Sequence, residues 1–151
     1  MNDRFTQGFI AGVIGWIPQE LFTLIMFYGF HNVKFRYHDF AALIAFNYKP
    51  NNIWDTIFAE LLVIIFVGFL GAGFSMLIKT IHSANLHFKG WAYGVIWWFM
   101  IYCAITLFTI KGIYQTIDSK TALINLIAAC IWGVCMARVF LFLNRKSFIQ
   151  N

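Results

Sequence analysis

The chain has 151 residues, of which 61% are hydrophobic, 20% aromatic and only 11% charged, and its net charge is +5. A soluble domain carries about 25% charged residues, so this composition excludes a water-soluble globular protein and predicts a surface that mostly faces lipid. The Lys and Arg residues fall almost entirely in short polar connections, without a basic run or a nucleic-acid motif, which excludes a nucleic acid as partner. The length fits a single transmembrane domain over residues 1–151.

Four apolar stretches are long enough to cross a bilayer, which takes about 20 helical residues. They cover residues 8–30, 53–78, 90–110 and 121–143. The first stretch contains Pro18, which removes a backbone donor and predicts a helix kink. It has no small-residue cleavage site, so we expect a retained helix and not a cleaved signal peptide. The sequence therefore predicts an all-α integral membrane protein with four transmembrane helices.

The connection between the first two helices contains a short amphipathic stretch, residues 34–49. Its apolar centre, residues 40–46, is too short to span, and Lys34, Arg36 and Lys49 flank it. This pattern predicts a short interfacial helix, either lying on the membrane or forming a shallow re-entrant segment. We expect Pro50 to end it.

An even number of spans places both ends of the chain on one side of the membrane. Six Lys and Arg residues fall on that side and five on the other. Because cytoplasmic loops carry the excess of Lys and Arg, the sequence favours cytoplasmic termini in a bacterial plasma membrane.

Two segments resemble each other and indicate an internal repeat. Residues 8–16 and 90–98 are identical at five of nine positions, and Glu60 and Gly68 of the second helix align with Asn125 and Gly133 of the fourth. The repeat would be two parallel two-helix units, with Glu20 at the position of Tyr102 and Glu60 at that of Asn125. The alternative is chance similarity, because Gly, Val, Ile and Trp are common in membrane helices.

Small residues spaced four apart predict close helix packing, within the chain or between copies of it. The glycines concerned are Gly8, Gly12, Gly68, Gly90, Gly94 and Gly133.

Glu20 and Glu60 are the acidic residues that lie deep in apolar stretches. An ionised side chain there costs at least about 2.5–3.5 kcal/mol, so both should face protein or water. Counting helical rise from the stretch ends, the two carboxyl groups can meet in the half of the bilayer away from the termini. They form either a proton or cation site or a protonated hydrogen-bonded clamp, with Tyr102 and Asn125 as the corresponding polar residues of the second unit.

The other reactive residue types indicate no chemistry. The histidines His31, His38, His82 and His87 lie outside the spanning stretches, which favours interfacial side chains over haem or metal ligands. Cys103, Cys130 and Cys135 lie in apolar stretches, which predicts buried thiols without disulfides. The sequence contains no motif of an activated nucleophile, a phosphate loop or zinc, so we expect no metal, cofactor or catalytic site.

Three segments of the chain resemble segments of known proteins. They are Gly-Phe-Ile-Ala-Gly-Val-Ile-Gly at residues 8–15, the pair Ala59-Glu60, and Lys-Gly-Trp-Ala-Tyr-Gly-Val at residues 89–95. They resemble the YqhR-like and related uncharacterised four-helix membrane proteins of Gram-positive bacteria, over most of the chain. The resemblance implies a multi-pass inner-membrane protein and transfers no activity and no site residues.

Three functions remain open. The short connections and the small-residue helix faces favour a non-enzymatic structural or accessory membrane protein. Such a protein would pack with itself or with a larger membrane complex. The alternative is a small proton- or cation-coupled transporter or channel, functioning as an oligomer, that uses Glu20 and Glu60. A membrane enzyme acting on lipid has the least support in the sequence.

Overall fold

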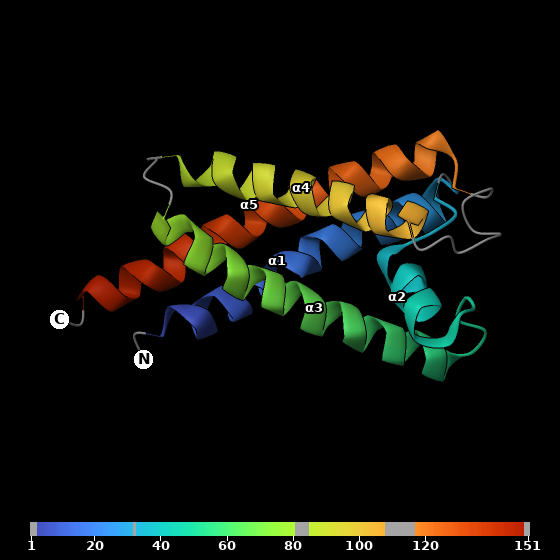
Figure 1. Ribbon diagram of the computed structural model, residues 1–151, viewed down its shortest axis with the longest axis horizontal. Helices are drawn as coiled ribbons and strands as arrows, with labels where there is room; N and C mark the ends of the chain where they lie inside the picture. Colours follow the sequence, from blue (N-terminus) through green and yellow to red (C-terminus); the bar gives the residue numbers. More distant parts are fainter. Residues whose placement is uncertain (1–2, 32, 81–84, 108–116, 150–151) are drawn as a thin grey trace.

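The computed structural model describes residues 3–31, 33–80, 85–107 and 117–149. These residues form five α-helices, which confirms the predicted all-α class (Figure 1). The helices are α1 (Arg4–Leu24), α2 (Tyr37–Phe46), α3 (Ile53–Thr80), α4 (Leu86–Leu107) and α5 (Ser119–Ile149). A π-helical turn, η1 (Ile25–Gly29), extends α1. α1 continues as an α-helix through Pro18.

Each long helix begins directly after a polar capping residue, which for α1, α4 and α5 lies before the predicted apolar stretch. The side-chain oxygen of the cap accepts a backbone N–H from the first turn, over 2.9 Å at Asp3, 2.9 Å at Asn52, 3.1 Å at Asn85 and 3.0 Å at Asp118. α1 and α4 therefore begin four residues before the predicted stretches. α5 also continues past residue 143, and the predicted end of the third stretch at residue 110 lies outside the described residues.

Three helical segments of the described chain are long and apolar enough to cross a membrane: Arg4–Gly29, Ile53–Ile78 and Ser119–Asn144. The fourth predicted span, α4, is not among them. The outer faces of the helices carry large apolar side chains, including Ile17, Leu21, Leu61, Phe69 and Phe99. A continuous apolar surface of this kind is typical of a lipid-facing protein.

The helices form a bundle in which α1 and α5 pack against each other in the middle (Figure 1). α3 packs on α1, α4 packs on α5, and α3 and α4 scarcely touch. The start of α1 and the end of α5 lie at one end of the bundle, and α2 lies at the opposite end beside the start of α3.

Glycines bring the backbones of two helix pairs into contact. A Cβ atom on Gly12 of α1 would collide with the carbonyl oxygen of Val67 in α3. A Cβ atom on Gly94 of α4 would likewise collide with the carbonyl oxygen of Ala129 in α5. Small residues at such crossings let helices approach closely. The glycine faces predicted from the spacing therefore pack within the chain.

The two crossings have equivalent partners, which corrects the predicted alignment of the second and fourth helices. Gly8 meets Gly71, and Gly90 meets Gly133 in the same way. Gly71 and not Gly68 thus corresponds to Gly133, a shift of three residues or nearly one helical turn. Gly68 instead leaves room for the ring of Phe9.

α2 packs across the end of the bundle against α3, with His38, Phe40 and Leu43 buried and Ile44 exposed. Asp39 Oδ2 accepts the backbone N–H of Arg36 over 2.8 Å at its start. α2 ends at Asn47, which has a left-handed backbone conformation with a φ of 65°. The backbone N–H of Asn47 donates to the Leu43 carbonyl over 3.0 Å and so caps the helix. The helix therefore stops before Pro50, contrary to the expectation that the proline ends it.

The half of the bundle nearest the ends of the chain has a closely packed core of Phe74, Trp132, Met136 and Phe140. Trp132 Nε1 donates a hydrogen bond to the Gly12 carbonyl over 3.0 Å, linking α5 to α1. All four side chains are at most 3% exposed, so they form the interior of this half of the described bundle.

Candidate functional site

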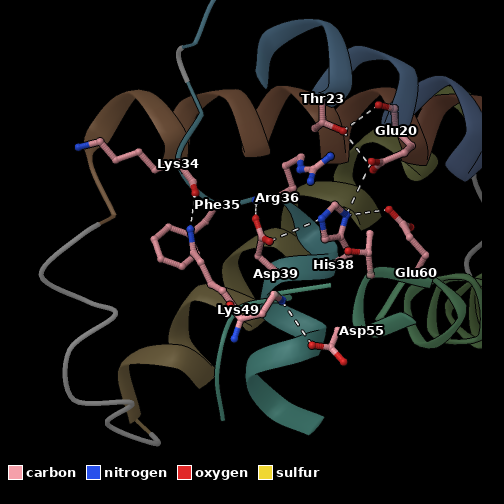
Figure 2. A network of polar contacts seen from close by, with 12 residues as sticks. Glu20, Thr23, Lys34, Phe35, Arg36, His38, Asp39, Lys49, Asp55 and Glu60 are labelled. Carbon is pink, nitrogen blue, oxygen red and sulfur yellow. Dashed lines mark hydrogen bonds and ion pairs between the residues drawn. The ribbon is translucent and has the colours of Figure 1, made fainter. Parts of the chain in front are cut away.

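Three separate elements bring titratable side chains together inside the bundle (Figure 2). Glu20 comes from the last third of α1, His38 from the first turn of α2 and Glu60 from the second turn of α3. All three lie in the half that α2 covers. The two acids of the long apolar helices therefore meet away from the ends of the chain, with a histidine between them.

The three side chains lie close enough to share one ligand. His38 Nδ1 lies 2.7 Å from Glu60 Oε1 and 4.0 Å from Glu20 Oε1. One nitrogen of His38 and one oxygen of each carboxylate all lie within 4.8 Å of one another. This grouping is a potential metal-binding set, contrary to the interfacial role expected for His38.

A second set of groups holds these side chains in place. His38 Nε2 lies 3.5 Å from Asp39 Oδ1, so both ring nitrogens face carboxylates. The Thr23 hydroxyl lies 3.1 Å from Glu20 Oε2 and 2.9 Å from the Glu20 carbonyl oxygen, and it can donate to one of them at a time.

The cluster is buried and rich in negative charge. The side chains of His38, Glu20 and Asp39 are 2%, 9% and 9% exposed, whereas that of Glu60 is 23% exposed. Figure 2 shows Arg36 beside the cluster, and its guanidinium lies 4.4 Å from the centre of the Phe27 ring. Three carboxylates and one guanidinium leave excess negative charge, which a buried site must offset with protons or a cation.

Several buried polar atoms of the cluster have no hydrogen-bond partner among the described residues. They are Glu20 Oε1, Glu60 Oε2 and His38 Nδ1. The 2.7 Å contact of His38 Nδ1 with Glu60 is therefore an ion-pair approach without hydrogen-bond direction. Buried polar atoms usually have a partner, so three atoms without one in the same place indicate a missing partner such as an ion.

Tyr102 and Asn125 form a separate polar group. Asn125 Nδ2 donates to Tyr102 Oη and to the Phe35 carbonyl, both over 3.2 Å. Tyr37 donates to the Asn125 carbonyl over 2.7 Å, and burial raises the pKa of the Tyr37 hydroxyl well above its ordinary value. The phenol therefore keeps its proton and remains a donor, and this group attaches the segment before α2 to α5.

A salt bridge continues this attachment at the start of α5. Lys34 Nζ lies 3.6 Å from Asp118 Oδ2, and the backbone N–H of Lys34 donates to Thr121 Oγ1 over 3.0 Å. Hydrogen bonds from the hydroxyl and the backbone N–H of Thr121 lower the pKa of the Asp118 carboxyl group, and the nearby charge of Lys34 lowers it further. Asp118 is therefore ionised at neutral pH and can hold both the helix start and Lys34.

An apolar cavity of about 330 Å³ is lined mainly by residues of α2, α3, α4 and α5. Its walls include Phe66 and Leu70 of α3 and Trp97 and Ile101 of α4. Glu20, His38 and Glu60 are not part of its lining, so the polar cluster lies outside this cavity.

The remaining candidates from the sequence do not join the cluster. His31 and His87 are exposed, and His82 lies outside the described residues. Pro18 lies within α1, less than one helical turn before Glu20. The helix kink expected at Pro18 stays a prediction.

Sequence reasoning missed His38, Asp39 and Thr23 as members of one site. The available signal was the pair His38-Asp39 beside the first intramembrane helix, but a single His next to an Asp is common on protein surfaces.

No protein-family model, no curated protein and no solved structure matches this chain. The site must therefore be interpreted from its own geometry.

Proposed function

We propose that this chain is a non-enzymatic, four-span membrane protein that binds a cation at Glu20, His38 and Glu60. The observation that carries the proposal is the convergence of two carboxylates and an imidazole from three elements, each with a buried polar atom that lacks a hydrogen-bond partner among the described residues. A bound cation offsets the negative charge and supplies the missing partners.

The fourth span in this proposal is α4. Its 22 residues give a length of about 33 Å at about 1.5 Å per residue, enough for a hydrocarbon core of about 30 Å. α4 also packs along α5 through the same type of glycine crossing that joins α1 and α3. With four spans both ends of the chain lie on one side, and the excess of Lys and Arg favours the cytoplasmic side of a plasma membrane.

Binding, and not conduction, is the role that the packing supports. A cation can reach the cluster past Glu60, whose side chain is the most exposed of the three. Beyond the cluster, the interior is filled by the buried core of Phe74, Trp132, Met136 and Phe140, and the apolar cavity beside this core has no charged residue in its lining. A pathway across the membrane would therefore need a second copy or another protein, and an accessory role in a membrane complex fits a single-sided site. The kinship to the YqhR-like proteins is part of the same proposal.

The experiment is thermal unfolding of purified protein in detergent micelles, after chelation, against Na⁺, Ca²⁺, Mn²⁺ and Zn²⁺. A ligand that binds the folded state raises the unfolding midpoint by mass action. We expect at least one of these cations to raise the midpoint of the wild type but not that of the Glu20→Gln/Glu60→Gln double variant. The proposal is wrong if none of them raises the midpoint, or if the double variant responds equally.

A further inference from the structure

Building on the proposed cation site, we propose that the ion is a divalent first-row transition metal bound by Glu20 Oε1, His38 Nδ1 and Glu60 Oε1. These three atoms belong to α1, α2 and α3, so the metal would fasten the helix that covers the bundle end to two long helices.

The spacing of the three atoms suits such an ion. Metal bonds to carboxylate oxygen and imidazole nitrogen are about 2.0–2.2 Å long, which at tetrahedral angles places ligand atoms about 3.3–3.6 Å apart. The contacts of His38 Nδ1 with Glu60 and with Glu20, at 2.7 and 4.0 Å, bracket this range. Changes of about 0.4–0.9 Å in these two distances would bring them into the range.

The charges of the three ligands balance a divalent ion. Two carboxylates and a neutral imidazole sum to the opposite of a 2+ charge, so the loaded site is neutral. Neutrality matters here because Glu20 and His38 are buried, and an unpaired buried charge is costly. A monovalent ion would leave part of that cost in place.

The surroundings of His38 resemble those of a metal ligand. A ligating histidine usually directs its other ring nitrogen at a carboxylate, which fixes the tautomer and the ring orientation. Asp39 Oδ1 lies 3.5 Å from His38 Nε2, on the side away from both glutamates. Asp39 is itself held by the backbone N–H of Arg36, and Glu20 is held by the Thr23 hydroxyl. Each buried ligand thus has a second group that orients it.

The donor types select the class of metal. Imidazole suits zinc and its neighbours in the first transition row, whereas Ca²⁺ and Mg²⁺ prefer oxygen ligands in greater number. Three protein ligands leave one position for water, as in open zinc sites. Glu60, with its partly exposed side chain, lies where the ion would enter.

The test is titration of the purified, chelated protein with Zn²⁺ by calorimetry and with Co²⁺ by visible spectroscopy. Co²⁺ bound to nitrogen and oxygen shows no thiolate charge-transfer band, which separates this site from Cys103, Cys130 and Cys135. We expect Glu20→Gln, Glu60→Gln and His38→Gln each to weaken binding at least about tenfold, and Asp39→Asn to weaken it about 10–100-fold.

Two variants serve as matched controls, Asp55→Asn in the first turn of α3 and His87→Gln on α4, and both should bind as the wild type does. Glutamine keeps the shape of glutamate and removes one of the negative charges crowded in the cluster, so we expect the Glu60→Gln variant in chelator to unfold no earlier than the wild type. An unchanged Co²⁺ spectrum in Glu60→Gln and His38→Gln overturns the inference, as does a wild type that binds neither metal. If Na⁺ or Ca²⁺ alone stabilises the wild type through Glu20 and Glu60, the metal class is wrong while the cation site stands.

Discussion

Aromatic side chains between the long helices donate hydrogen bonds to backbone carbonyls of neighbouring helices. Tyr93 of α4 donates to the Leu70 carbonyl of α3 over 2.9 Å, and Trp132 of α5 donates to the Gly12 carbonyl of α1 over 3.0 Å. Each bond joins helices that belong to different glycine-crossed pairs. In an apolar environment the donor has no water as an alternative partner, so these bonds orient the two pairs relative to each other.

At the residue scale we predict that Tyr93→Phe lowers the free energy of unfolding by about 0.5–1.5 kcal/mol. The substitution removes the hydroxyl and leaves the ring in place against Phe74 and Trp132. The measurement is denaturant unfolding in micelles, with Tyr28→Phe as control because Tyr28 is 63% exposed. Equal stability of the Tyr93 variant and the wild type would show that the bond contributes nothing.

Glycines allow close contact within two helix pairs, α1 with α3 and α4 with α5. A larger residue at one of these crossings should push the two helices of that pair apart. At Gly12 the nearest atom to an added methyl group is a backbone oxygen, which cannot rotate away as a side chain can. At Gly29 the nearest atom is Ile25 Cγ2 at 4.0 Å, which is ordinary contact. The same substitution therefore has different consequences at the two positions.

At the element scale we predict that Gly12→Ala and Gly94→Ala each lower the free energy of unfolding by about 1–3 kcal/mol, because the helices must move apart. Gly29→Ala should change it by less than about 1 kcal/mol. The same micelle unfolding measurement applies to all three variants. A Gly12 variant as stable as the Gly29 variant would contradict the close crossing of α1 and α3.

The number of spans is a property of the whole molecule. α1, α3 and α5 are apolar enough to cross by themselves, and α4 lies alongside them with several aromatic side chains. If α4 crosses as well, the two ends of the chain share a side; if it does not, they lie on opposite sides.

At the scale of the whole molecule we predict that reporters fused to either end of the chain report the same compartment. A fluorescent protein that is dark after export and a phosphatase active only after export give complementary readouts. A phosphatase inserted after Tyr48, in the connection between α2 and α3, should report the opposite side. Reporters at the two ends that disagree would exclude a fourth span.

The sequence by itself determined the all-α class, the long apolar helices and the two acids that the structure brings together. Hydropathy is a local property, summed over about 20 residues, so composition alone predicts apolar helices. The cost of burying charge similarly singled out Glu20 and Glu60 without any knowledge of their neighbours.

Only the tertiary structure decided what those acids meet. His38 reaches them because α2 folds back over the end of the bundle, which depends on contacts of Tyr37 and Phe35 with a helix some 90 residues later in the chain. The alignment of the two glycine crossings was also decided in space, since Gly68 and Gly71 lie nearly one turn apart on α3 and only Gly71 meets Gly8. Periodicity shows that a helix has a small-residue face, but packing selects the neighbour that this face contacts.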